Sequence, residues 1–369
     1  MYTRPMKPDA QQKKPSISDI ASRAGVSIAT VSRVINASTY VRPELSMRVN
    51  DAIESTGYVK LRSTRSATAE EARLIGLMIP DLDNPFFATL AKGIQSVAST
   101  RGLDIVLTDS GRDPDSAQTG LRRLAEHGVR ALLVVAPEGF KPEGNALVAP
   151  GTKEAIPVVY VDRKIHTDTA HYVGSENYQG ACNAAAYLYS LGHRDILYLA
   201  GGDGLSTDQE RYAGFLAGVS GLAVGSGMKP KVNRASSIQQ RPLDERTLYE
   251  ACGFSLDKAY RAVKARLKHG APFSAVFAAD DYMAYGALGA LREAGLRVPE
   301  DISIVGFDDL PYSSIIGLTT VRQQAFELGV ASITLALDLA NGRRQGTQSV
   351  ILSTSLIIRS SCAVNARHC

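Results

Sequence analysis

From Leu74 onward, the sequence alternates short apolar runs with amphipathic stretches of helical length. The runs are LIGLMI from Leu74, IVL from Ile105, ALLVV from Ala131, PVVYV from Pro157, ILYLA from Ile196, AVFAA from Ala275 and SIVGF from Ser303. Such runs, separated by helices, are typical of parallel strands that helices cover on both faces. Because this many strands exceed one compact unit, the pattern predicts two doubly wound α/β lobes.

The segment from Ser16 to Asn36 has a different pattern, which predicts two short helices joined by a tight turn. Ser16 and Asp19 have the spacing of a capping box, and Gly25 stands where the first helix would end. A third helix is predicted from Pro43 to Gly57. The residues at core spacing are Ile17, Ile20, Ala21, Ala24, Val31, Val34, Ile35, Leu45, Val49, Ala52 and Ile53.

The outer face of the second helix carries Ile28, Ala29, Ser32 and Arg33, an unusual set for a surface that meets only water. It suits the major groove of DNA, because apolar groups contact thymine methyls, Arg pairs with guanine, and hydroxyls reach phosphates. A helical hairpin without special function is the alternative. The candidate DNA-binding residues of this segment are Ser27, Ile28, Ala29, Thr30, Ser32, Arg33 and Asn36.

The string from Ile20 to Asn36, with AGVS followed by TVSRVIN, resembles the DNA-binding headpiece of the LacI family of bacterial transcription regulators. The resemblance implies a sequence-specific regulator, usually a repressor, with a core like the periplasmic sugar-binding proteins. A small-molecule effector, a sugar or a sugar-like compound, would bind between the lobes and alter operator affinity. Since one small helix in one groove binds modestly, a homodimer on a palindromic DNA operator is expected.

These patterns divide the chain into a mobile arm (residues 1–15), a helix-turn-helix domain (16–58), a linker or hinge (59–73) and a two-lobed effector-binding and dimerisation domain (74–369). By the family resemblance, the chain crosses between lobes near Val173, near 314–323 and near 342–348. Lobe 1 would then hold about 74–173 and 324–341, and lobe 2 about 174–313 and 349–360. A Gly- and Ser-rich segment, 218–250, is expected to be an inserted surface loop.

The linker departs from the family pattern at two positions. Ala67 stands where a leucine usually wedges into the minor groove, and Lys60 replaces the usual proline. Because Ala cannot unstack a base step as Leu does, we expect no strong central kink in the DNA. Arg62 and Arg65 are expected to act through phosphates or a narrowed groove.

Composition and charge are consistent with a DNA-binding protein outside the membrane. The chain is 44% hydrophobic and 21% charged, with no apolar run of membrane-spanning length and no signal-peptide core, so we expect a cytoplasmic protein. Residues 1–73 hold 12 Lys and Arg against 7 Asp and Glu, whereas the remainder holds 29 against 30. That basic excess is the expected footprint of phosphate contact, although a solvated basic tail would give the same count.

In parallel sheets, ligands bind beyond the carboxyl ends of the strands, and polar residues recur at that place in this chain. Carboxylates and guanidinium groups bind hydroxyls in pairs, and an aromatic ring covers the apolar side of a sugar, so the set suits a carbohydrate. Singly, each of these residues could instead be a helix cap or part of the core. The strand-end residues are Asn84, Phe86, Phe87, Asp162, Arg163, Thr207, Arg211, Asp280 and Asp281.

The family resemblance adds Phe254, in CGFSLDKAY, as an aromatic partner of Phe86 and Phe87, and Gln323, in LTTVRQ, from a crossing strand. It also assigns Arg211 and Asp281 to the polar edge of the ligand. Where the family usually has Asn, this chain has Asp280. Two adjacent carboxylates in the cleft would favour a donor-rich or cationic ligand, unless arginines balance them or Asp280 simply caps the next helix.

Enzyme functions find no support in the sequence, which lacks GxGxxG, a Walker loop, GxSxG and HExxH. The 4 cysteines lie far apart and outside any CxxC spacing, so no metal site is expected, and no cofactor is expected either. A cytoplasmic sugar-binding protein without regulatory DNA binding remains as the alternative to a regulator.

Overall fold

The computed structural model describes residues 16–36, 40–56, 72–143, 147–148, 154–165, 167, 169–202, 204–220, 247–268 and 273–365. They belong to two compact units, one within residues 1–66 and the other within 67–369. The predicted arm (1–15) and Arg62, Arg65, Lys60 and Ala67 of the linker lie outside the described residues. Among the described helices, none has the length and apolar character needed to cross a bilayer.

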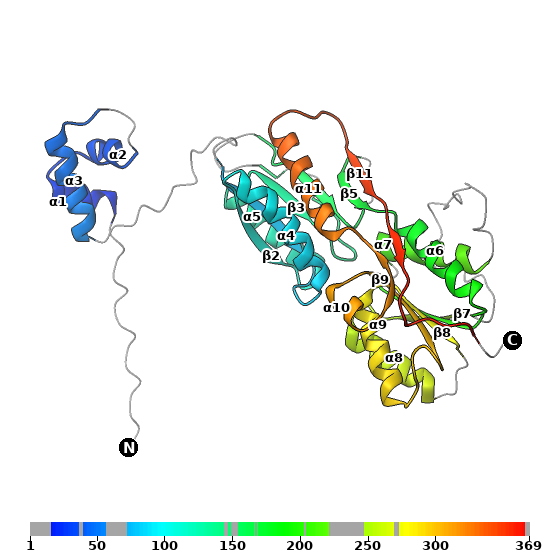
Figure 1. The fold of residues 1–369 in the computed structure, drawn as a ribbon. Coiled ribbons are helices and arrows are strands. Elements are labelled where there is room, and N and C mark those ends of the chain that lie inside the picture. Colours follow the sequence, from blue (N-terminus) through cyan, green and yellow to red (C-terminus); the bar gives the residue numbers. More distant parts are fainter. Residues whose placement is uncertain are drawn as a thin grey trace, which may run out of the picture. The chain divides into compact units, whose positions relative to one another are not determined.

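The first unit contains three helices, α1 (Ile17–Ala24), α2 (Ile28–Asn36) and α3 (Pro43–Thr56) (Figure 1). Ser16 and Asp19 form the expected capping box, and Gly25 ends α1 in the left-handed conformation with φ of 61°. Because Gly25 makes this turn, α2 can pack back onto α1 and α3. The small shared core consists of Ile20, Ala21, Ala24, Val31, Val49 and Ala52.

Lobe 1 is a six-stranded parallel sheet in the order β11-β5-β4-β3-β1-β2. The strands are β1 (Leu74–Ile79), β2 (Asp104–Asp109), β3 (Ala131–Val134), β4 (Val158–Val161), β5 (His171–Ser175) and β11 (Ser349–Leu352). The helices are α4 (Pro85–Thr100), α5 (Pro114–Glu126) and α11 (Ala325–Ala340). Ile75, Leu77 and Ile79 of β1 join the core with α4 and α11, whereas Met78 faces the core with α5. The alternation places helices on both faces of the sheet.

Lobe 2 has the strand order β12-β10-β9-β8-β6-β7, parallel except for the β10–β12 pair. Its strands are β6 (Ile196–Ala200), β7 (Thr247–Ala251), β8 (Ala275–Ala278), β9 (Ser303–Asp308), β10 (Thr319–Arg322) and β12 (Ser355–Ile357). Its helices are α6 (Asn177–Ser190), α7 (Ser206–Val219), α8 (Leu256–Lys268), α9 (Asp281–Glu293) and the short α10 (Pro311–Ile315). In its core, Tyr198 stacks on Phe277, and Phe215 packs against both rings.

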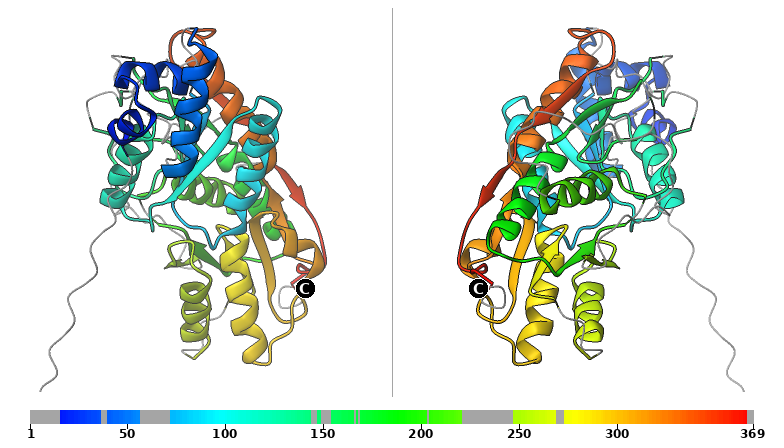
Figure 2. Two further views of the ribbon diagram at one scale, coloured as in Figure 1. Left: turned by 90° about the vertical axis from the view of Figure 1, so that its left-hand side faces the viewer. Right: turned by 90° about the vertical axis from the view of Figure 1, so that its right-hand side faces the viewer.

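The chain passes between the lobes after β5, after β10 and after β11. Figure 2 shows β11 and the segment that follows it, in red, running along one side of the core. β11 pairs with β5, so residues 349–352 lie in lobe 1, and the predicted assignment of this segment to lobe 2 is wrong. The third crossing therefore follows Leu352 instead of lying near 342–348.

The predicted insertion at 218–250 is shorter than expected, because α7 extends to Val219 and β7 begins at Thr247. Residues 221–246 lie outside the described residues. All seven apolar runs of the sequence overlap strands. Five of the described strands lie outside those runs, and of these only β10 was expected, as a crossing strand implied by the family resemblance; the others are β5, β7, β11 and β12. The sequences of the strands that were not predicted mix polar with apolar residues, as HYVGS in β5 and TLYEA in β7 do, so they carry a weaker hydrophobic signal.

Candidate functional site

A small cavity lies between the two lobes at the carboxyl ends of their strands. Its volume is about 20 Å³, room for roughly one water molecule. Ten of the eleven predicted effector residues line it, together with Asp308. The lining residues are Asn84, Phe86, Phe87, Asp162, Arg163, Thr207, Arg211, Phe254, Asp280, Asp308 and Gln323. The strand-end rule therefore brings together residues that are far apart in the sequence.

Arg211, in α7, is the central cation of the site. Its Nε donates to Asn177 Oδ1 at 2.9 Å, and its Nη1 donates to the Ala279 carbonyl at 2.6 Å. Nη1 also lies 3.6 Å from Asp308 Oδ1, and the guanidinium lies 4.0 Å from the centre of the Phe307 ring. With only 3% of its surface exposed, Arg211 is held rigidly and supplies a fixed positive charge.

Asp308 ends β9 and was not predicted as a site residue. Gln323 Nε2 donates to Asp308 Oδ1 at 2.6 Å, and this bond joins β9 to the crossing segment that follows β10. Burial raises the pKa of Asp308 well above its ordinary value, although Arg211 opposes the shift. The sequence signal was available, because Asp308 directly follows a buried strand in the run SIVGFDD.

Asp162 and Arg163 follow β4 and are both buried. Asp162 has φ of 64°, a left-handed conformation that turns the chain sharply after the strand. Burial raises the pKa of Asp162 and lowers the pKa of Arg163 to about 10. Arg163 Nη1 donates to the Ala136 carbonyl at 3.1 Å, and its guanidinium lies 5.7 Å from the centre of the Phe254 ring.

Four buried polar atoms in the lining have no hydrogen-bond partner among the described residues. They are Asp162 Oδ1, Arg163 Nε, Thr207 Oγ1 and Gln323 Oε1. A buried polar atom left unpaired costs about 1–3 kcal/mol, so such atoms are rare unless a ligand or water satisfies them. Their clustering around one cavity marks a place built to hold a polar molecule.

Asp280 and Asp281 are adjacent in the sequence, but their side chains contact different parts of the structure. Asp280 lines the cavity and also caps α9, because its Oδ1 accepts from the Met283 N–H at 2.7 Å. Asn84 Nδ2, from lobe 1, donates to Asp280 Oδ2 at 3.4 Å, so this carboxylate also joins the lobes. Burial raises the pKa of Asp280 to about 6. Asp280 therefore lies in the cleft and also caps the helix that follows it, so the two predicted roles of this residue occur together.

The structure corrects the predicted placement of Asp281, which does not line the cavity. Its carboxylate accepts from the Leu310 N–H at 2.8 Å and from the hydroxyls of Ser313 and Thr320 at 2.5 Å each. Burial raises the pKa of Asp281 to about 7 despite these donors. The Asp281 side chain points away from the cavity because Asp281 is the first residue of α9, one position after the helix cap Asp280. Asp281 fastens the segment around α10 to lobe 2.

The aromatic side of the cavity is formed by Phe86, Phe87 and Phe254. Phe86 and Phe87 lie in the first turn of α4 and meet edge to face, with ring centroids 5.3 Å apart. Phe254 comes from the opposite lobe, and Gly201 lies directly against its ring. A Cβ at Gly201 would sit 2.0 Å from Phe254 Cζ, so only glycine leaves room for the ring there.

Three further contacts join the lobes around the cavity, and we call them the interlobe latch: Arg112 with Gly253 and Phe254, Glu138 with Gly204, and Lys164 with Ser206 and Glu210. Arg112 Nη2 donates to the Phe254 carbonyl at 3.2 Å and also pairs with Asp81. The Gly204 N–H donates to Glu138 Oε1 at 3.0 Å, and the Lys164 N–H donates to Ser206 Oγ at 2.8 Å. No local sequence pattern indicated these pairs, because their members are far apart in the chain.

In the headpiece, α2 presents the predicted DNA-binding face. Ile28 is 56% exposed, and Ala29 and Arg33 are exposed beside it. Ser27 Oγ accepts from the Thr30 N–H at 3.2 Å, which caps α2. The side chain of Asn36, like Arg62 and Arg65, lies outside what the structure describes. An exposed Ile on a helix that also presents Arg33 is a poor surface for water but a suitable one for the major groove.

Comparisons with known proteins agree with this arrangement. The family description "Bacterial regulatory proteins, lacI family" matches residues 16–60, and "Periplasmic binding protein-like domain" matches residues 185–362. The ribose operon repressor of Halalkalibacterium halodurans is 30% identical over 346 residues, which cover 93% of this chain and 96% of that protein. The chain belongs to the LacI family.

A second LacI-family relative, the HTH-type transcriptional repressor PurR of Pectobacterium carotovorum, is 30% identical over 94% of this chain and 97% of its own length. The lac repressor dimer bound to operator and the anti-inducer ONPF has a TM-score of 0.66, at 25% identity over 95% of this chain and all of that chain. A complex of the transcriptional regulator CelR with cellobiose has a TM-score of 0.64, at 28% identity over 94% and 99%.

Membership establishes the general function. The chain is a DNA-binding transcription regulator of the LacI family, controlled by a small-molecule effector, and its named relatives are repressors. The family consists of regulators and not of enzymes. Among the described residues, no group of three or more His, Cys, Asp or Glu could hold a metal ion.

Proposed function

We propose that this regulator responds to a neutral, hydroxyl-rich effector of the sugar class, bound between the lobes by the residues that line the cavity. The unpaired buried atoms carry this proposal: Asp162 Oδ1, Gln323 Oε1, Thr207 Oγ1 and Arg163 Nε. These atoms include hydrogen-bond acceptors and a donor. A hydroxyl group can donate to the acceptors and accept from the donor, whereas an anionic group only accepts and a cationic group only donates.

The charges of the lining support a neutral ligand. Three carboxylates, Asp162, Asp280 and Asp308, face two guanidinium groups, Arg163 and Arg211. An anionic ligand such as a sugar phosphate or sugar acid would add to the excess of carboxylates in a buried site. A sugar appears in the names of two of the similar proteins: cellobiose in the CelR complex and ribose in the ribose operon repressor.

The size of the cavity links effector binding to a change in the lobes. At about 20 Å³ it is too small for a sugar, so the effector requires the lobes to separate or the aromatic wall to move. The interlobe latch resists that separation, since Arg112, Glu138 and Lys164 all reach across the cleft. An effector that favours one lobe spacing over another shifts operator affinity by its differential affinity for the two states.

The operator is read by the outer face of α2, through Ser27, Ile28, Ala29, Thr30, Ser32, Arg33 and Asn36. Arg62 and Arg65 of the linker act through phosphates or a narrowed groove. The exposure of Ile28, Ala29 and Arg33 supports this assignment. The regulator acts as a repressor in the cytoplasm, on a palindromic operator that presents one half-site to each headpiece of a homodimer.

The dimer is supported by an apolar surface on lobe 2 and by the lac repressor, which is a dimer in its operator complex. On α10 and just after it, Ile315 is 79% exposed, Tyr312 60% and Ile316 47%. We call these three residues the α10 patch. Large exposed apolar side chains that lie together mark interaction surfaces. We assign the α10 patch to contact with a second copy of the chain.

Substitution of Arg33 by Ala tests the reading of the operator. A bidentate Arg–guanine contact is worth about 1–3 kcal/mol of discrimination, so Arg33→Ala should lower the preference for operator over random DNA by roughly 5- to 150-fold. Fluorescence anisotropy with both DNAs, at one salt concentration, measures the ratio. Arg23→Ala removes the same charge from α1 and should lower the affinity for operator and for random DNA alike. An unchanged operator preference in the Arg33 variant would remove Arg33 from the base contacts.

A further inference from the structure

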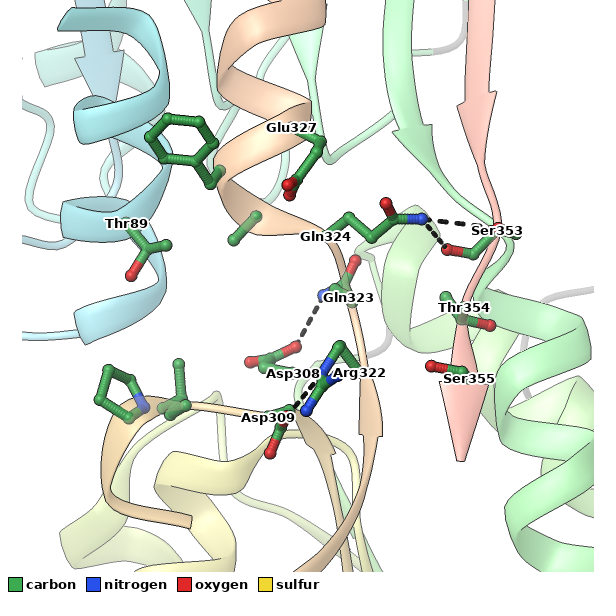
Figure 3. Close-up of a pocket in the computed structure, with 14 residues that line it drawn as sticks. Thr89, Asp308, Asp309, Arg322, Gln323, Gln324, Glu327, Ser353, Thr354 and Ser355 are labelled. Atoms are coloured by element: carbon green, nitrogen blue, oxygen red, sulfur yellow. Dashed lines mark hydrogen bonds and ion pairs between the residues drawn. The ribbon is translucent and has the colours of Figure 1, made fainter. Parts of the chain in front are cut away.

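A second and larger pocket lies where the chain crosses between the lobes (Figure 3). Its volume is about 540 Å³, within the range of pockets that hold small molecules. Lobe 1 contributes Thr89 and the first turn of α11, and lobe 2 contributes the segment from Asp308 to Pro311. The crossing residues 322–325 and 353–355 complete it. We call it the hinge pocket.

The lobe 1 wall of the hinge pocket is rigid. Gly93 of α4 and Gly329 of α11 bring the two helices into backbone contact. A Cβ at Gly93 would lie 2.0 Å from the Phe326 carbonyl oxygen, and one at Gly329 would lie 2.2 Å from the Leu90 carbonyl oxygen. The first turn of α11, which carries Phe326 and Glu327 into the pocket lining, is therefore fixed in place.

The lobe 2 wall is equally well held. Asp309 accepts from Arg322 Nε and from Arg359 Nη2, each at 2.7 Å. Asp308 accepts from Gln323 Nε2 at 2.6 Å, as the dashed lines of Figure 3 show. Gln324 Nε2 donates to the Ser353 carbonyl at 3.0 Å and so ties the two crossing segments together. Both walls are preformed, which lowers the entropic cost of binding a ligand.

Several polar groups of the lining still have capacity for hydrogen bonds. Within the described part of the chain, the Glu327 carboxylate has no ion-pair or hydrogen-bond partner, and Gln323 Oε1 is buried and unpaired. The first turn of α11 has no side-chain cap, so its N–H groups can donate, and the guanidinium of Arg322 is half exposed. Donors and acceptors are thus interleaved, and the exposed ring of Phe326 lies beside them.

The charge of the lining limits the class of ligand. The lining holds three carboxylates, and two of them are already paired: Asp309 with Arg322 and Arg359, and Asp308 with Arg211. The carboxylate of Glu327 is left without an opposite charge, so the lining has a negative excess. Phosphates and carboxylates are therefore disfavoured. Hydroxyl groups, in contrast, can donate to the carboxylates and accept from Arg322 and the helix N–H groups, while Phe326 covers an apolar ring face.

We propose that the hinge pocket is a second binding site, distinct from the central cavity, for a neutral polyhydroxyl molecule. Asp308 and Gln323 line both the central cavity and the hinge pocket, so the two sites share one wall. A ligand in the hinge pocket contacts both lobes and their crossing segments. Its binding is linked to lobe spacing, and occupancy of one site changes the affinity of the other.

Equilibrium dialysis of the full-length protein against labelled ribose, glucose and cellobiose tests the proposal. Ser355→Trp places a large ring in the hinge pocket from an exposed position, and Arg163→Ala disables the central cavity. For at least one sugar, binding should persist in Arg163→Ala and weaken at least tenfold in Ser355→Trp. Ser349→Trp, exposed on β11 outside the pocket lining, is the matched control and should bind as the wild type does.

Glu327→Ala is a milder second variant and should weaken the same binding without adding bulk. If every sugar that binds is lost in Arg163→Ala and retained in Ser355→Trp, the hinge site is overturned while the central site stands. Equal binding by wild type, Ser355→Trp and Glu327→Ala also overturns it, as does the absence of any binding in Arg163→Ala.

Discussion

Substitution of Arg211 by Met is expected to weaken effector binding strongly and to lower the free energy of unfolding by about 3–5 kcal/mol. That loss of stability is the usual cost of removing one member of a buried ion pair. Arg211 is 3% exposed and supports Asn177, Ala279 and Asp308 at once. Without it, the buried carboxylate of Asp308 loses its nearest cation. Effector affinity should fall at least 100-fold, as measured by dialysis or calorimetry.

The loss of stability in Arg211→Met should depend on pH. Burial already raises the pKa of Asp308 well above its ordinary value, and removal of Arg211 raises it further. A carboxyl whose pKa is raised in the folded state is stabilising while protonated, and this contribution is lost as pH rises through the folded pKa. Urea titrations should therefore show a smaller destabilisation at pH 5 than at pH 8.

A second substitution separates the two roles of Arg211. In Arg211→Met with Asp308→Leu, both charges are gone, and most of the lost stability should return because a buried ion pair is commonly replaceable by apolar residues. Effector binding should not return. If Arg211→Met binds effector with wild-type affinity, Arg211 does not hold the ligand, and the assignment of the central cavity fails.

Substitution of Ile315 by Glu in the α10 patch is expected to yield a monomer with weak operator affinity. Ile315 is 79% exposed in the single chain, so the substitution costs that chain little. In a dimer it would bury a charge against an apolar surface. Loss of the second headpiece should lower operator affinity by about 10²–10⁴-fold, the range of gains from linking two binding modules.

Sedimentation velocity gives the oligomeric state of the Ile315→Glu variant, and anisotropy gives its operator affinity. Val364→Glu is a matched control, because Val364 is 64% exposed but lies outside the α10 patch. It should remain a dimer. A dimeric Ile315→Glu protein with full operator affinity would place the contact between copies elsewhere.

The sequence predicted most of the central cavity because one topological rule was sufficient. Residues after β1, β4, β6 and β8 meet at one edge of the sheets, and the family resemblance added Phe254 and Gln323. The rule states where a residue lies but not where its side chain points. Asp281 therefore was misplaced, since its carboxylate turns toward Leu310, Ser313 and Thr320.

Other features could not be predicted from local pattern. β11 and β12 are separated by two residues, and both have exposed and half-buried side chains, so their sequence does not reveal which sheet each one joins. The latch residue Arg112 reaches residues 141 and 142 positions away. The hinge pocket depends on backbone contact at Gly93 and Gly329, which only packing discloses.

We propose that operator affinity responds to a neutral sugar bound between the lobes. Fluorescence anisotropy tests this proposal with the full-length protein on the DNA upstream of its own gene, repeated with neutral sugars, sugar acids, sugar phosphates and nucleosides. We predict tight, salt-dependent binding that one neutral sugar shifts by roughly 5- to 150-fold, the usual scale of such coupling. A compound that binds the protein and leaves operator affinity unchanged, with no other compound shifting it, would contradict the claim.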